Sequence, residues 1–285
     1  ALKTWLFVFL LISFGVYFLL TSARVTQTTQ LFMLTGNIDK GAYVFDAAGC
    51  GSCHIIKGSE DRLSLAGGQS FSTDFGMFYA PNVSMSVTHG IGDWTLDQFA
   101  TAVREGVSPE GEHYFPVFPY TDYMKMTDQD IVDLWTFWQT LPAVDTANKA
   151  HDISFPYSIR RNLGVWKLLY ADAAYVSQEG SRGAYLVEAL GHCAQCHTPR
   201  DMLGGLDESR WMMGGPSPDG RSNVPAISPS QLKWSAEAIA EYLFTGFTPE
   251  YDVVGGHMAV VVDNMSRLAS EDRNAIAHYL KNLTK

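Results

Sequence analysis

The chain contains the same five-residue pattern twice, Cys-x-x-Cys-His at residues 50–54 and again at 193–197. This pattern is the attachment site of a c-type haem, because two thiols at this spacing can both form thioethers with one macrocycle. The histidine that follows is then placed to bind the iron from one side. Two copies predict two covalently held haems and a protein that handles electrons. The predicted haem-attachment residues are Cys50, Cys53, Cys193 and Cys196, and the predicted proximal iron ligands are His54 and His197.

A zinc site and a thioredoxin-like dithiol are the alternatives for these cysteines. Zinc sites usually gather four ligands within a few tens of residues, whereas these two pairs lie in separate halves of the chain. A redox dithiol does not need the trailing histidine and normally occurs once. The pattern therefore favours haem. The chain has four cysteines, so two attached haems leave no thiol for a disulfide.

Length and charge restrict the class of protein further. The 285 residues are enough for about two domains. The formal net charge of −10 disfavours nucleic acid as a partner. An acidic surface suits a basic docking partner, although the same excess could simply keep the protein soluble.

The N-terminal segment is long and apolar, with no charged residue from Thr4 to Ala23. A helix of that length spans about 30 Å, the thickness of a bilayer hydrocarbon core. A secretory signal peptide is the alternative, because Thr21-Ser22-Ala23 resembles a cleavage site. We expect residues 1–24 to form an uncleaved signal-anchor helix in the bacterial inner (cytoplasmic) membrane. Because c-type haem is attached outside the cytoplasm, the haem domains are expected in the periplasm.

The chain repeats itself, which indicates a duplicated domain. Residues 41–47 precede the first motif and residues 183–189, of similar sequence, precede the second; both predict a short amphipathic helix. The pairs Ala80-Pro81 and Val224-Pro225 also correspond, and each half closes on a predicted helix with an N-terminal cap. The expected fold is all-α: the N-terminal transmembrane helix, then two tandem class I cytochrome c domains. The expected domain ranges are 34–145 and 175–285, with a linker over 146–174.

That linker carries a basic cluster of Arg160, Arg161 and Lys167 beside Trp166. We expect the segment to pack along both domains. A docking surface for a partner is the alternative, although charged runs are usually solvated.

Each iron also needs a second protein ligand or an open face. In the second half the candidate is Met258, on a glycine-flanked loop in Gly255-Gly256-His257-Met258, with His257 and Met265 as alternatives. A methionine there could instead pack the core. In the first half we expect Met126, directly before the closing helix, with Met124 and then His113 as alternatives. The remaining histidines, His192 among them, are expected in ordinary surface or hydrogen-bonding roles.

Several segments resemble a known family, the membrane-bound cytochrome c subunits of bacterial periplasmic alcohol and aldehyde dehydrogenases. The segments are residues 113–121, 190–200 and 255–264. The resemblance implies that electrons pass from a catalytic subunit towards quinone or an oxidase, and that Met258 is a haem ligand. Relatives with Met-Pro in the earlier loop take the other ligand from there; Phe118-Pro119 departs from that pattern and leaves Met126 as the substitute. Many members of the family have three haems and a cleaved signal.

The sequence therefore predicts a membrane-anchored dihaem electron-transfer subunit with no catalytic residues of its own. Partners that would fit are a dehydrogenase, a bc1-type complex, a terminal oxidase or a small soluble cytochrome. The alternative is a dihaem enzyme, similar to a thiosulfate dehydrogenase or a peroxidase, in which one haem reacts with substrate. No acid–base set around either motif supports that reading.

Overall fold

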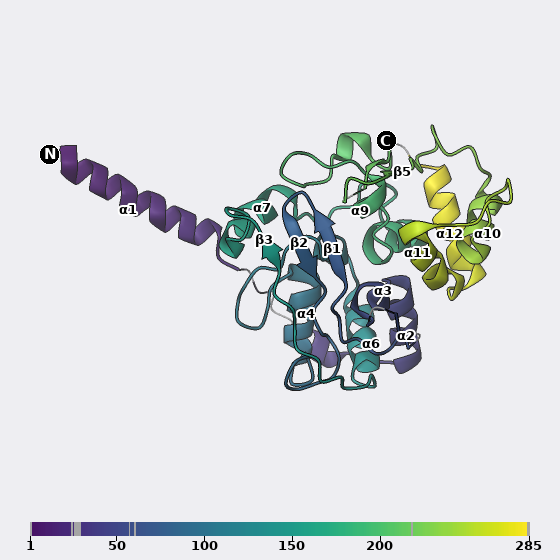
Figure 1. Cartoon of the computed structure of the whole chain (residues 1–285), viewed down its shortest axis with the longest axis horizontal. Helices are drawn as coiled ribbons and strands as arrows, with labels where there is room; N and C mark the ends of the chain where they lie inside the picture. The colour runs from purple at the N-terminus through teal and green to yellow at the C-terminus, as the bar shows by residue number, and fades with distance from the viewer. Residues whose placement is uncertain are drawn as a thin grey trace.

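The structure is a computed structural model, and it describes residues 2–23, 25, 30–56, 58–59, 61–217 and 219–283. Figure 1 shows one long helix, α1, that projects from a compact body made mostly of helices. The N-terminal half (residues 34–145) and the C-terminal half (residues 175–285) of that body lie against each other. The segment between them, residues 146–174, lies near the root of α1.

Helix α1 spans Leu2–Leu20 and has no buried residue. By length and composition it could cross a membrane, and none of its apolar window is buried inside the protein. A core helix would hide such a surface, so the exposure agrees with either an anchor or a signal sequence. Ala1 and Arg24, the ends of the predicted anchor, lie outside the described residues.

The N-terminal half is built around two packed helices, α2 (Ile38–Ala47) and α6 (Asp128–Trp138). They cross at Gly41, where a Cβ would overlap the backbone of Asp133. Phe45 packs its ring edge against Phe137 and Trp138. Around this pair lie η1 (Leu31–Met33), α3 (Cys50–His54), α4 (Leu96–Glu105) and α5 (Tyr120–Tyr123).

The C-terminal half repeats this plan. Helix α8 (Arg182–Ala184) continues into a π-helical turn, η3 (Tyr185–Leu190), and Gly183 meets the backbone of Ala275 as Gly41 meets that of Asp133. The other helical elements are α9 (Ala194–His197), η4 (Glu208–Arg210), α10 (Ala236–Thr245), α11 (Gly256–Ser266) and α12 (Ser270–Lys281). The helices predicted before each motif and at the end of each half are therefore present.

In the part of the chain that the structure describes, two small antiparallel sheets accompany the helices, so the all-α prediction was too simple. Strands β1 (Ser70–Thr73), β2 (Gly76–Tyr79) and β3 (Asp152–Ile153) form one sheet in that order, with Ser70 opposite Tyr79 and Gly76 opposite Ile153. Strands β4 (Gly215–Pro216) and β5 (Asn223–Val224) form the other. Strands of two to four residues are too short to produce a recognisable alternation of apolar and polar residues.

The segment between the halves contains β3, a 3₁₀ turn η2 (Arg160–Asn162) and helix α7 (Leu163–Tyr170). It contacts both halves: Lys167 Nζ donates to the Gly106 carbonyl at the end of α4 (2.9 Å), and Trp166 Nε1 donates to the Leu203 carbonyl (3.0 Å). The expected packing of this segment along both halves is thus observed.

The basic cluster of this segment is used inside the molecule. Arg161 donates to the Phe18 carbonyl in the last turn of α1 (2.9 Å), and Arg160 donates to the His113 carbonyl (3.0 Å). Lys167 and Arg161 therefore each place a cation at the carboxyl end of a helix, where the helix dipole favours positive charge. These contacts do not support the docking-surface alternative.

The two halves meet through reciprocal contacts. In one direction, Tyr43 Oη donates to Asp272 (2.6 Å) and accepts from the backbone N–H of Ala269 (3.1 Å) at the start of α12. In the other, Tyr185 Oη donates to Asp130 and accepts from the N–H of Thr127 (3.2 Å) at the start of α6. Tyr43 and Tyr185 occupy equivalent places in the two repeats. Each half therefore places its tyrosine on the first turn of the other half's closing helix.

Candidate haem-binding sites

The first cysteine motif forms its own short helix, α3. It begins after Gly49, whose left-handed backbone (φ 62°) lets the chain turn sharply out of α2. Within the motif, Cys50 is half-buried and Cys53 is exposed. Although the Cys53 side chain is open to solvent, the surrounding protein raises the pKa of its thiol to about 11, with the nearby Cys196 as the second cause.

His54 ends this helix with its ring held by a backbone carbonyl. Its Nδ1 lies 2.9 Å from the Pro81 oxygen. A carbonyl oxygen can only accept, so Nδ1 carries the proton and Nε2 is the nitrogen left for a metal. Burial lowers the pKa of His54, which favours the neutral imidazole that an iron ligand needs.

The second motif repeats this arrangement. His197 ends α9, and its Nδ1 lies 2.8 Å from the carbonyl oxygen of Pro225. Burial likewise lowers the pKa of His197, and it raises that of Cys193 to about 12. Pro81 and Pro225 are the prolines that correspond in the repeat. The same orienting bond thus occurs at both sites.

The two motifs face each other across the seam between the halves. Asn264 of α11 donates from Nδ2 to Ser52 Oγ, inside the first motif (2.6 Å). Gln195, inside the second motif, donates to Asp122 of α5. Each motif is therefore in contact with the opposite half of the molecule, and Cys196 lies near enough to contribute to the raised pKa of the Cys53 thiol.

His192 is a residue of this seam that sequence reasoning did not single out. It has a positive φ of 38°, and its ring lies edge-on to that of Tyr123, 5.7 Å between centroids. Tyr123 Oη donates to the Ala48 carbonyl (2.8 Å), just before the first motif. Burial lowers the pKa of His192, and the Asp122 carboxylate opposes that shift. Its position directly before Cys193 was the available signal.

The methionine candidates differ in their surroundings. Met126 is 4% exposed and belongs to the apolar core, between α5 and α6. Its alternatives point elsewhere: His113 Nε2 lies 3.0 Å from the Thr21 carbonyl at the end of α1. Met124 lines a small pocket of about 120 Å³ with His113 and Lys167, beside α1 and α7.

In the other half, Met258 is the third residue of α11 rather than part of a loop. It is half-buried and packs against the apolar core, whereas the neighbouring His257 is exposed. Met265 is buried further along the same helix. Of the two residues beside the glycines, Met258 is thus the one that faces the protein interior.

These sites suit a haem at each motif. Each offers two unpaired thiols and a neutral imidazole whose Nδ1 is occupied and whose Nε2 is left for iron. A protein with two such sites in a mostly helical body is a c-type cytochrome.

Comparison with known proteins agrees with this class. No family model matches the chain. A "Diheme cytochrome c-type" protein of Cereibacter sphaeroides is 50% identical over 265 residues, 90% of each chain. The fructose dehydrogenase cytochrome subunit of Gluconobacter japonicus is 33% identical over 92% of this chain and 55% of its own length. The cytochrome c subunit of the alcohol dehydrogenase (quinone) of Gluconobacter oxydans is 32% identical over 86% and 54%.

The chain belongs to the dihaem c-type cytochromes, and it carries two covalently bound haem c groups. It spans nearly the whole of the Cereibacter protein but slightly over half of the dehydrogenase subunits.

Proposed function

We propose that this protein is a membrane-anchored cytochrome that passes electrons from a periplasmic dehydrogenase subunit to an acceptor of the respiratory chain. Electron transfer follows from its family. One repeated observation supports the assignment to particular residues: in both motifs the histidine Nδ1 donates to a proline carbonyl. This bond orients both imidazoles in the same way and leaves Nε2 for a metal.

In this proposal Cys50 and Cys53 hold one haem and Cys193 and Cys196 hold the other. His54 and His197 would bind the two irons through their imidazoles, and Met126 and Met258 would supply the second protein ligands. Haem supplies a one-electron couple, and a thioether ligand raises its potential relative to a second histidine. The protein keeps each imidazole neutral and oriented. It also brings the motifs together at one seam, where Ser52 contacts Asn264.

The anchor is α1, which is supported by its uniformly apolar and exposed surface. Its carboxyl end is joined to the body by Arg161 and His113 rather than by a loose tether. Because c-type haem is attached outside the cytoplasm, two haems support a periplasmic body with the N-terminus of α1 on the cytoplasmic side.

The proposed donor is a dehydrogenase subunit, because the relatives named above include cytochrome subunits of fructose and alcohol dehydrogenases. The acceptor would be quinone, a bc1-type complex, a terminal oxidase or a small soluble cytochrome. The net charge of −10 would favour a donor or acceptor with a basic docking surface.

The experiment that tests this function is a spectroscopic titration of the detergent-solubilised holoprotein. We expect two haems per chain, both low-spin, with no change in the reduced spectrum on addition of carbon monoxide. A carbon monoxide shift in half of the haem would reveal an open iron. That result would contradict the carrier proposal and favour a dihaem enzyme with one reactive haem.

A further inference from the structure

Helix α7 is attached to the body by its polar groups, and its apolar groups face outwards. Lys167 and Trp166 make the hydrogen bonds to the two halves. Val165, Leu168 and Leu169 are exposed, and 63% of the Leu169 surface is accessible to solvent. Residues at i, i+3 and i+4 share one face of a helix. A surface helix of a soluble protein normally has the opposite orientation.

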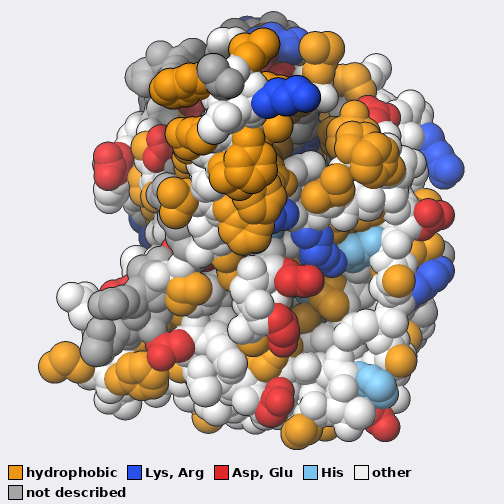
Figure 2. All heavy atoms as spheres, turned by 90° about the vertical axis from the view of Figure 1, so that its left-hand side faces the viewer, with side chains coloured by type: hydrophobic (Ala, Val, Ile, Leu, Met, Phe, Trp, Pro, Cys, Tyr) orange, Lys and Arg blue, Asp and Glu red, His pale blue; other side chains and the backbone are white. Residues whose placement is uncertain are grey.

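The chain directly before α7 extends this apolar surface. Phe155, Tyr157 and Ile159 are all exposed. Figure 2 views the molecule from the side on which α1 leaves it, so that α1 points towards the viewer and its exposed apolar side chains stand among the hydrophobic groups of the upper part of that view. We define the α7 patch as the surface formed by six exposed residues: Phe155, Tyr157, Ile159, Val165, Leu168 and Leu169.

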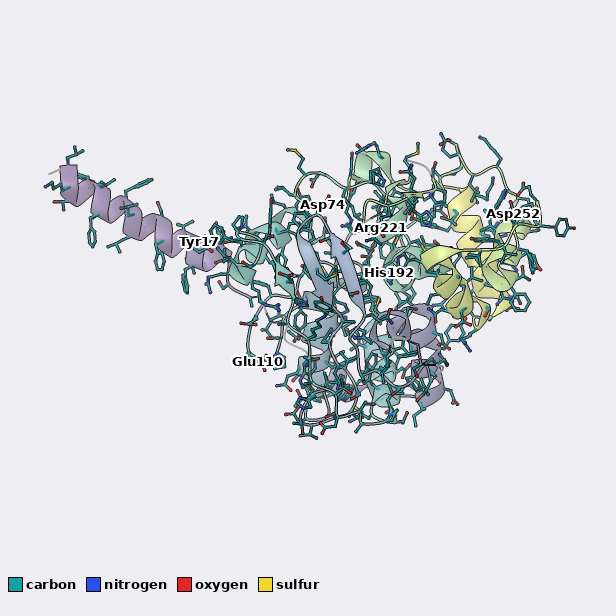
Figure 3. The ribbon with its side chains drawn as sticks, in the orientation of Figure 1. Tyr17, Asp74, Glu110, His192, Arg221 and Asp252 are labelled. Carbon is teal, nitrogen blue, oxygen red and sulfur yellow. The ribbon has the colours of Figure 1, made fainter. Side chains whose placement is uncertain are left out.

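The α7 patch begins where the apolar part of α1 ends. Tyr17 Oη donates to Asn162 Oδ1 (2.8 Å), and the Arg161 guanidinium lies 3.5 Å from the centre of the Phe18 ring. Gly164 approaches the backbone of Thr21 so closely that a Cβ would overlap it. Figure 3 shows Tyr17 at this root of α1, while Asp252 lies at the opposite end of the molecule. The last turn of α1 and the first turn of α7 are thus fixed to each other.

Because the last turn of α1 is fixed to the first turn of α7, the surface of a bilayer that α1 crosses would lie at the level of α7. We infer that the α7 patch rests in the interfacial layer of that bilayer, so that the haem-bearing body contacts the membrane at two places. This inference rests on the anchor role proposed for α1. Apolar side chains with tyrosine and tryptophan beside basic residues are the chemistry that interfacial helices present to lipid. The patch adjoins α1 directly, which favours lipid over a protein partner.

The test uses nitroxide labels on single cysteines in the holoprotein, reconstituted into phosphatidylcholine–phosphatidylglycerol vesicles. The native cysteines are held in thioethers in the proposed holoprotein, so each introduced cysteine is the free thiol. The variants are Leu169→Cys in the α7 patch, Leu10→Cys in α1 and Asp252→Cys at the far end. Collisions of the label with oxygen, which enters lipid, are compared with collisions with a water-soluble nickel chelate.

We expect the label at Leu169→Cys to favour oxygen over the chelate several-fold more than the label at Asp252→Cys, and Leu10→Cys to favour oxygen most. If Leu169→Cys behaves like Asp252→Cys while Leu10→Cys favours oxygen, the inference fails and the anchor stands. If Leu10→Cys also collides with the chelate, the anchor proposal fails first. A Leu169→Cys label shielded from both reagents would mean that protein, either a partner or a second copy, covers the patch, and would also overturn the inference.

Discussion

At the scale of single residues, the site depends on one repeated contact. A proline carbonyl accepts a hydrogen bond from the imidazole of each predicted proximal histidine, at 2.9 Å in one half and 2.8 Å in the other. The cysteine motifs predict where haem is attached, because their spacing matches one macrocycle. They cannot predict which carbonyl orients the histidine, because Pro81 and Pro225 lie 27 and 28 residues further along the chain. The repeat did mark both prolines, although not their role.

Replacing Met258 by leucine tests the proposed ligand of the second iron. The thioether is lost while the side chain keeps about the same volume. About half of the reduced haem should then bind carbon monoxide, and the potential of that haem should shift. The matched control is Met265→Leu, a buried methionine of the same helix. If Met265→Leu opened an iron and Met258→Leu did not, the assignment would be wrong.

At the scale of elements, each half depends on a glycine at a helix crossing. Gly41 lets α2 approach the backbone of α6, and Gly183 does the same against α12. Sequence periodicity predicts these helices well, since their apolar faces are several residues long. It misses the short strands, and it cannot show that α11 begins at Gly256 and includes Met258, because glycine pairs are typical of loops.

Gly41→Ala should destabilise the protein by about 3 kcal/mol, because overpacking at a backbone contact forces the helices apart. Denaturant unfolding of the holoprotein, followed by far-ultraviolet circular dichroism, measures the change. Gly15→Ala is the control, since nothing lies within 4 Å of a Cβ at that position of α1. Equal midpoints for the two variants would show that the close approach at Gly41 does not determine stability.

At the scale of the whole molecule, the halves are joined by contacts between residues far apart in the chain. Asp272 accepts hydrogen bonds from Tyr43, 229 residues away, and from Arg182 (2.6 Å in each case). The repeated segments can be recognised in the sequence, because residues 41–47 and 183–189 align without gaps before the two motifs. How the copies face each other could not, since no local pattern records a partner more than two hundred residues distant.

The contact at Asp272 should make stability depend on pH. The hydrogen bond from Arg182 is the main cause that lowers the pKa of Asp272 in the folded state. A carboxyl whose folded pKa is depressed stabilises the protein above its unfolded pKa, near 4, and this contribution is lost as the pH falls further. Asp272→Asn should therefore lower the free energy of unfolding by about 1–2 kcal/mol at pH 7 and by less at pH 3, where part of the contribution is already lost.

Calorimetry of the variant and the parent at both pH values measures this difference. Asp263→Asn is the control: its partner, Arg267, is four residues away, directly after the end of α11, and such surface pairs contribute about 0.3–0.5 kcal/mol. If Asp272→Asn lowered stability by the same amount at pH 3 as at pH 7, the ionised carboxylate would be excluded as the cause.

Each half contacts the other through its equivalent tyrosine, Tyr43 or Tyr185. Two identical subunits related by a twofold axis make the same kind of reciprocal contact, in which one residue pair occurs twice. Here both copies lie in one chain, joined by residues 146–174. Two separate subunits would dissociate on dilution, and the haem of one would then be separated from the haem of the other. In a single chain the effective concentration of one half around the other is set by the linker rather than by expression level. The two haem-attachment motifs therefore stay beside each other whatever the concentration of the protein.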